Sequence, residues 1–425
     1  MSHWEAVEYV EKSQLDNGLT IVTEKVERVR SVAVGVWVHT GSRDEPDQKA
    51  GITHFLEHML FKGTETKSAF DIALSMESVG GYINAFTSNE YTCYYTRSLD
   101  TQLKRSLDVL SDMVLHSTFP EEEIEKEKRV VIEEMKMYRD SPEDYLFEAF
   151  IGKLFQNHPL GRPIIGFEDT VRTFSREDLF QYVRERYQPW NILVSVAGNM
   201  DHDEVRKQVE VHFKDPGMEG KKKSAVSFDA YKRHCEILHR PIEQTHMIIG
   251  RRGLYFDHKD KYLLLLANTV LGGGMSSRLH QNVREKYGYC YSIGTFNQSF
   301  TDSGLFGVYI GTDREYVKHV RELIGEEFRK LYQEAIPAKE LKEAKSQLKG
   351  KLLLSQESMS NRMTRMAKSE LYFKRFVTLD ELVESIDSVT ENEIQEFASG
   401  FFQPEHFSES LLLPEYQENR KVTTE

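Results

Sequence analysis

Two histidines and a glutamate share one short segment of the chain, at His54, Glu57 and His58. Residues four apart on an α-helix lie on one face, so the imidazoles of His54 and His58 can reach the same metal ion. Glu57 would project beside them, near the place of a metal-bound water. The alternative is that two surface histidines and a glutamate coincide by chance. The pattern predicts a hydrolytic metal site if the chain offers a third ligand.

A third ligand is available on an expected helix from Glu121 to Arg139, which begins after Pro120. Glu127 and Glu134 lie two turns apart on this helix and therefore share a face. Two imidazoles and one carboxylate leave a position for water on Zn²⁺, the arrangement of catalytic zinc sites. A solvated acidic face is the alternative, because the segment is rich in glutamate. The apolar stripe of the helix is expected to consist of Ile124, Val131, Met135 and Tyr138.

The surroundings of the motif resemble the inverzincin metallopeptidases, the family of mitochondrial processing peptidase, pitrilysin and insulin-degrading enzyme. The resemblance covers nearly the whole chain and is strongest with half-length bacterial members. It rests on the following segments: GITHFLEHMLFKG at residues 51–63, Asn84-Ala85-Phe86-Thr87, Tyr94-Tyr95, EKRVVIEEM at 127–135 and HPLGRP at 158–163.

The resemblance implies a zinc endopeptidase with one Zn²⁺ per chain. By this comparison His54, His58 and Glu134 bind the metal, Glu57 is the general base on a zinc-bound water, and Glu127 supports the site from the same helix face. The expected reaction is hydrolysis of short or unfolded peptides in a closed chamber. One alternative is a non-catalytic, peptide-binding or structural subunit, because such relatives exist that have lost the zinc residues. A zinc hydrolase acting on another bond is a third reading, which the extended match opposes.

The resemblance also assigns residues to substrate recognition and to the transition state. Arg284 and Tyr291 match an arginine–tyrosine element that would bind the substrate backbone or the developing oxyanion. Asp144 and Glu148, four apart on an expected helical face, match acidic positions that receive a basic residue before the cut in mitochondrial processing peptidase. A surface arginine, a core tyrosine and a solvated acidic face are the alternatives.

An expected strand carries the remaining substrate-binding residues, Asn84, Ala85, Phe86 and Thr87. An extended peptide could pair with such a strand by β-addition, which reads the main chain rather than the sequence. The alternative is an ordinary sheet position. Strand addition would favour unfolded or short peptides.

Size, charge and cysteines restrict the class of protein. With 425 residues and 39% hydrophobic content, the chain is too long for one ordinary core. The net charge of −13 argues against a nucleic-acid partner. Cys93, Cys235 and Cys290 are widely spaced, which favours reduced thiols and a cytoplasmic protein. No signal peptide and no apolar run of membrane-spanning length is recognisable, so we expect a soluble protein without a membrane partner.

The second half of the chain repeats features of the first at a constant offset. Gln188-Pro189 recurs as Gln403-Pro404, and Ser175, an expected helix start, corresponds to Thr390. Chance similarity in the order of elements is the alternative to duplication. Two further pairs are the strand at 32–38 with 245–251 and the helix at 101–116 with 315–332.

These observations predict an α+β fold of two similar repeats, each a mainly antiparallel sheet covered by helices. We expect a zinc-binding domain at 1–215, a polar linker at 216–228 and a second domain at 229–425 without zinc ligands. Single-chain family members are about twice as long and close a chamber with four repeats. A chain with two repeats is therefore expected to form a homodimer, or a heterodimer with a related subunit.

Overall fold

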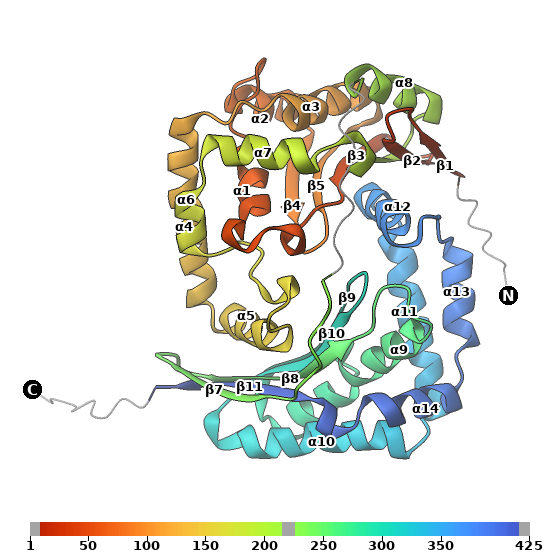
Figure 1. Cartoon of the computed structure of the whole chain (residues 1–425). Helices are drawn as coiled ribbons and strands as arrows, with labels where there is room; N and C mark the ends of the chain where they lie inside the picture. Colours follow the sequence, from red (N-terminus) through yellow and green to blue (C-terminus); the bar gives the residue numbers. More distant parts are fainter. Residues whose placement is uncertain (1–8, 215–225, 416–425) are drawn as a thin grey trace, which may run out of the picture. The chain divides into compact units, whose positions relative to one another are not determined.

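The computed structural model describes residues 9–214 and 226–415, which form two compact units (Figure 1). Each unit combines three segments of the chain. The first takes Met1–Met137, Asn157–Ser227 and Lys351–Val383, and the second takes Tyr138–Gln156, Phe228–Gly350 and Glu384–Glu425. Most of the expected linker, residues 216–225, lies outside the described residues, and 226–228 form neither helix nor strand.

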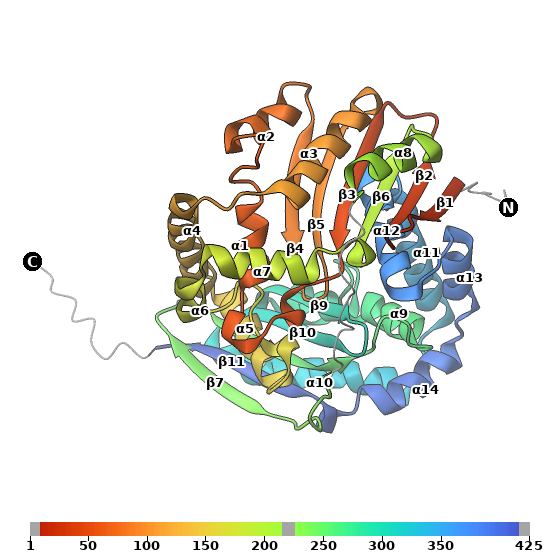
Figure 2. The same cartoon turned by 45° about the horizontal axis from the view of Figure 1, so that its top comes forward.

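The first unit contains a six-stranded sheet in the order β1-β2-β6-β3-β5-β4. Only β2 and β6 pair in parallel; the other neighbours are antiparallel. Figure 2 shows β3, β5 and β4 side by side, with β4 at one edge. The strands are β1 Tyr9–Gln14, β2 Thr20–Lys25, β3 Ser31–Val38, β4 Tyr82–Thr87, β5 Thr92–Leu99 and β6 Ile192–Gly198.

Helices cover both faces of this sheet. Val34 and Val36 of β3 face a core shared with α1 and α3, whereas Ala33 and Trp37 pack against Met363 of α12 on the other face. The alternation of valines at 32, 34, 36 and 38 predicts a strand with one buried face, and this is wrong because α12 covers the second face as well. The helices are α1 Ile52–Met59, α2 Ala69–Glu77, α3 Leu103–His116, α4 Glu121–Asp140, α6 Glu168–Thr173, α7 Arg176–Arg186, α8 His202–His212 and α12 Met359–Phe373.

The second unit repeats the architecture with a five-stranded sheet in the order β7-β11-β8-β10-β9. Again a single neighbouring pair, β7 with β11, is parallel. Helix α5 packs on β8 and β11. The strands are β7 Cys235–Arg240, β8 Thr245–Gly253, β9 Cys290–Ser299, β10 Gly304–Thr312 and β11 Ser408–Pro414. The helices are α5 Pro142–Leu154, α9 Lys261–Gly272, α10 Val317–Gln333, α11 Ala338–Ser355, α13 Leu379–Ser388 and α14 Glu391–Phe401, of which α11 and α13 extend into the first unit.

The two sheets confirm the predicted α+β fold of two similar repeats. Strands β2, β6, β3, β5 and β4 correspond in order and direction to β7, β11, β8, β10 and β9. Ser175 and Thr390 cap α7 and α14 in the same way: each side chain accepts the N–H of the residue three positions on. Equivalent caps at equivalent positions follow from duplication more simply than from chance.

The compact units do not follow the expected division into 1–215 and 229–425, because the repeats exchange a helix. Helix α5 comes from the first repeat and packs in the second unit, and α12 comes from the second repeat and packs on β2, β3 and β6. Ser195 of β6 donates a hydrogen bond to the carbonyl oxygen of Met363 (2.8 Å), and Lys12 of β1 forms an ion pair with Glu370 (2.7 Å). These contacts fix α12 against the sheet.

No helix within residues 9–214 and 226–415 combines the length and the apolar character needed to cross a membrane.

Candidate active site

A buried carboxylate anchors the start of α1, the helix that carries the predicted metal motif. Glu45 accepts the backbone N–H groups of Gly51 (2.7 Å) and Thr53 (2.8 Å), which have no partner within the helix. Gly51 has a φ of 93°, a left-handed conformation that favours glycine. Burial raises the pKa of Glu45 to about 7 despite these hydrogen bonds. The first turn of α1 is therefore set by a side chain outside the helix.

The structure brings His54, His58 and Glu134 together. Oε2 of Glu134 lies 3.9 Å from Nε2 of His54 and 3.7 Å from Nε2 of His58. One donor atom from each residue lies within 4.8 Å of the others, and within 9–214 and 226–415 this is the one group that could hold a metal ion. The helix spacing predicted the pair of histidines, and α4, expected from the sequence, supplies Glu134.

The donor set fits Zn²⁺. Donor atoms at about 2.0–2.2 Å from one zinc ion are about 3.3–3.5 Å apart in a tetrahedral site, slightly closer than the separations here. Burial, with the charge of His58, lowers the pKa of His54 to about 3, so this imidazole is neutral as a ligand must be. Its Nδ1 is buried and has no hydrogen-bond partner in the described part of the chain.

Glu127 supports His58 from the same face of α4. Nδ1 of His58 donates to Oε2 of Glu127 (2.9 Å), which leaves Nε2 free to face Glu134. Burial would lower the pKa of His58, but the hydrogen bond and the charges of Glu127 and Glu134 outweigh burial and raise it. Lys62 forms an ion pair with the other oxygen of Glu127. The sequence analysis missed Lys62, which lies beyond the end of α1 at Met59.

Glu57 projects from α1 beside the metal ligands and is held by β4. The hydroxyl of Thr87 donates to Oε2 of Glu57 (2.5 Å). Burial raises the pKa of Glu57, and the hydrogen bond from Thr87 opposes that rise. A half-buried carboxylate with a raised pKa suits proton transfer near neutral pH. The sequence analysis placed Thr87 only among the substrate-binding residues and missed this contact.

Strand β4 carries the predicted peptide-binding residues at the edge of the first sheet, with β5 as its one neighbour. Ala85 is buried toward the core that contains α1, while Asn84 is exposed. The backbone N–H of Ala85 donates to Oδ1 of its neighbour Asn84 (2.9 Å). Phe86 makes an edge contact with Trp37 on the face that α12 covers. A peptide that pairs with this edge would compete with Asn84 for the N–H of Ala85.

The other predicted site residues belong to the second unit. The guanidinium of Arg284 lies 6.0 Å from the ring centre of Tyr291, and its Nη1 lies 2.8 Å from Nε2 of His280. Tyr291 is 80% exposed. Asp144 and Glu148 are exposed on α5. The roles predicted for these four residues in catalysis or substrate binding remain predictions.

Comparison with known proteins identifies the family. Residues 20–168 match the family model described as "Insulinase (Peptidase family M16)", and residues 173–348 match "Peptidase M16 inactive domain". The first match contains the whole metal-ligand set.

Relatives match more than nine-tenths of the chain. A Bacillus subtilis protein described as "Uncharacterized zinc protease YmxG" is 43% identical over 407 residues, which cover 95% of this chain and 98% of that protein. A Streptomyces coelicolor protein, "Uncharacterized zinc protease SCO5738", is 38% identical and covers 92% of this chain and 86% of its own.

Solved structures share the fold. A protease from Helicobacter pylori has a TM-score of 0.90 at 24% identity, covering 96% of this chain and 100% of its own. An M16-like peptidase from Alicyclobacillus acidocaldarius has a TM-score of 0.84 at 19% identity, covering 97% of this chain and 99% of its own. By its sequence matches and its fold, the chain belongs to the M16 (insulinase) family of peptidases.

Proposed function

We propose that the protein is a zinc-dependent endopeptidase that holds one Zn²⁺ per chain through His54, His58 and Glu134. The observation that carries this proposal is the ligand set with Glu57 held beside it by Thr87. Relatives named zinc proteases, with matches over more than nine-tenths of the chain, support the same activity.

Zn²⁺, when bound, supplies Lewis-acid activation of water and of the scissile carbonyl. Glu57 takes the proton of the attacking water and passes it to the leaving amine as the peptide bond breaks. The hydrogen bond from Thr87 keeps Glu57 oriented and limits the rise of its pKa. Glu127 and Lys62 fix the tautomer and the orientation of His58.

The free edge of β4 is the proposed docking strand for the peptide substrate. Backbone pairing with an edge strand requires an extended segment, so short or unfolded peptides are the proposed substrates. Asp144 and Glu148 supply the proposed preference for a basic residue just before the cut. Arg284 and Tyr291 supply the proposed contacts to the substrate backbone or the oxyanion.

A homodimer that closes a chamber around the peptide belongs to the same proposal. Each site would join the zinc residues of one subunit to Arg284 and Tyr291 of the other. Glu57→Gln and Arg284→Ala chains would each be inactive alone, and random mixing would restore at most about a quarter of wild-type activity. No recovery after confirmed subunit exchange would reject this arrangement.

Two matched substitutions test the proposed activity. Glu57→Gln should keep bound zinc and lose nearly all turnover, because Glu57 is not a ligand. Glu134→Gln should lose much of its zinc, because a neutral amide replaces a charged ligand. Metal content and peptidase rate are measured together on both variants. A Glu57→Gln chain with a near-normal rate would reject the mechanism, and a wild-type chain without tightly bound zinc would favour a non-catalytic subunit.

A further inference from the structure

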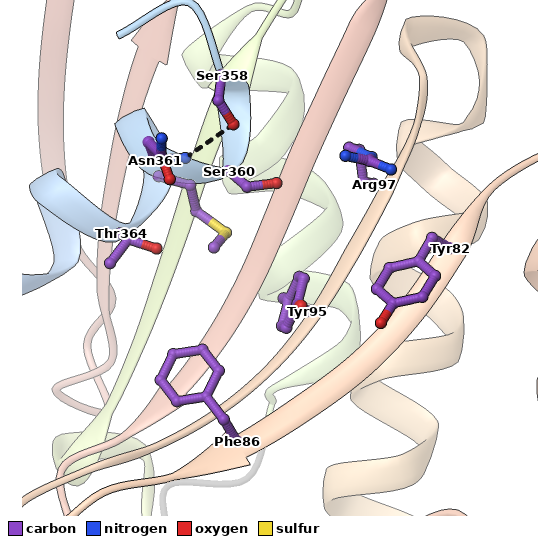
Figure 3. Close-up of a pocket in the computed structure, with 9 residues that line it drawn as sticks. Tyr82, Phe86, Tyr95, Arg97, Ser358, Ser360, Asn361 and Thr364 are labelled. Carbon is purple, nitrogen blue, oxygen red and sulfur yellow. Dashed lines mark hydrogen bonds between the residues drawn. The ribbon is translucent and has the colours of Figure 1, made fainter. Parts of the chain in front are cut away.

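A pocket of about 430 Å³ opens on the face of the first sheet that α12 covers (Figure 3). Its floor consists of side chains from β4 and β5, and the first two turns of α12 form its wall. The floor residues are Tyr82, Phe86, Tyr95 and Arg97. In Figure 3 their side chains lie across from Ser360 and Thr364 of α12. The pocket lies wholly within the first unit.

Arg97 gives this pocket a positive charge. Its guanidinium lies 6.0 Å from the ring centre of Tyr82, and none of the described residues offers it a hydrogen bond or an ion pair. Among the described residues that line the pocket there is no aspartate or glutamate. Arg97 is solvent-exposed, so an incoming ligand can reach its guanidinium. The pocket therefore suits an anionic group from outside the described part of the chain.

The pocket and the candidate active site share β4. Side chains alternate along a strand, so Tyr82 and Phe86 face the pocket while Ala85 and Thr87 face the core that contains α1. Thr87 touches Glu57. A peptide that pairs with the free edge of β4 would direct alternate side chains toward Glu57 and toward the pocket.

We propose that this pocket is a substrate subsite for an acidic side chain, with Arg97 as its partner. The inference rests on the proposed function, because it needs a peptide paired with β4. Tyr82, which pairs with Arg97 across the two strands, precedes Thr87 by five positions. At about 3.4 Å per residue this corresponds to about 17 Å, so the acidic residue lies about four to six residues from the cut.

The reach of the side chains agrees with this assignment. Adjacent strands lie about 4.8 Å apart, so the backbone of an added peptide lies about 10 Å from β5. The extended side chains of Arg97 and of a glutamate on the added peptide are together long enough to meet across the Tyr82 ring. A lysine at the same peptide position would meet Arg97 with like charge, and the described lining offers it no carboxylate.

Binding to a Glu57→Gln chain tests the subsite without relying on turnover. The probes are fluorescent peptides of one neutral parent sequence in which glutamate, lysine or phenylalanine replaces one residue at a time. We expect glutamate to bind about five-fold more tightly than lysine at one position, as for a partly exposed ion pair. Arg97→Gln should reduce that ratio to about one, and Arg97→Glu should invert it. Thermal unfolding of both variants, measured by circular dichroism, confirms that they fold.

Arg206→Glu is the matched control. Arg206 is exposed on α8, which packs beside β2 at the other end of the sheet, so the preference for glutamate should persist. Equal affinity for glutamate and lysine at every position would overturn the proposal, as would a preference that survives Arg97→Gln. Tighter binding of phenylalanine than of glutamate would show an aromatic subsite instead. Cleavage of the parent by the wild-type chain is measured separately, so failure of the proposed function is distinguished from failure of the subsite.

Discussion

The contact between Glu127 and His58 should control metal affinity without direct contact to the metal. Nδ1 of His58 donates to a carboxylate that is itself buried and paired with Lys62. Glu127→Gln keeps the size of the side chain but removes its charge. The amide can still accept the N–H of His58 through one oxygen, so the tautomer persists while the electrostatic support is lost.

The magnitude follows from the geometry of this hydrogen bond. At 2.9 Å between a carboxylate and an imidazole, the bond is charge-assisted, and such bonds contribute about 1.5–3 kcal/mol. Each 1.4 kcal/mol changes an equilibrium constant about tenfold, so the zinc dissociation constant should rise by about 10- to 100-fold. The loss of the ion pair with Lys62 should also weaken zinc binding, because the side chain at position 127 is then held less firmly.

Competition with a chromophoric chelator measures the affinity. Glu133→Gln is the control, because Glu133 lies on the same helix, is exposed and pairs only with Lys136 among the described residues. Its substitution should leave the zinc affinity within about twofold of wild type. Equal affinity of Glu127→Gln and wild type for zinc would refute the reasoning, and so would an equal loss in both variants.

Three further predictions concern two side chains of the first unit and an acidic pair of the second unit. Thr87→Val removes the hydrogen bond that orients Glu57, so kcat should fall about tenfold at unchanged zinc content; a fall in zinc content instead would assign Thr87 to the metal site. Burial raises the pKa of Glu45 from 4.5 to about 7, so between these pH values the folded state holds a proton that the unfolded state has released. The free energy of unfolding should therefore decline between pH 4.5 and 7 by an amount on the order of 3 kcal/mol. Urea unfolding of Glu45→Gln should lack this decline, and parallel pH profiles would contradict the cause. Reversing Asp144 and Glu148 to lysine should shift cleavage away from sites that follow a basic residue, and an unchanged cleavage profile would discard that role.

Local spacing predicted the parts of the site that lie within single helices. His54 and His58 are one turn apart on α1, and Glu127 and Glu134 are two turns apart on α4, so helix geometry alone places each pair on one face. The apolar stripe of α4 was also predicted, except that Tyr138 is 39% exposed and belongs to the second unit.

Contacts between distant segments could not be predicted in this way. Thr87 meets Glu57 from another strand, and Glu45 caps α1 from a loop. The periodicity of apolar residues shows which face of a helix or strand is apolar, but not which other element covers that face. The sequence analysis therefore did not identify the packing of α12, whose apolar side chains, among them Met363 and Met366, lie on the sheet of the first repeat.

The exchange of α5 and α12 makes each half of the chain dependent on the other for folding. A fragment that ends before the linker would lack α12, and the face of β3 that carries Ala33 and Trp37 would be open to water. The helix that covers this face belongs to the second half of the chain. The second half in turn needs α5 of the first half to cover β8 and β11. Each sheet therefore has one face covered by a helix from the other repeat, and neither half of the chain contains all the elements that bury its own sheet.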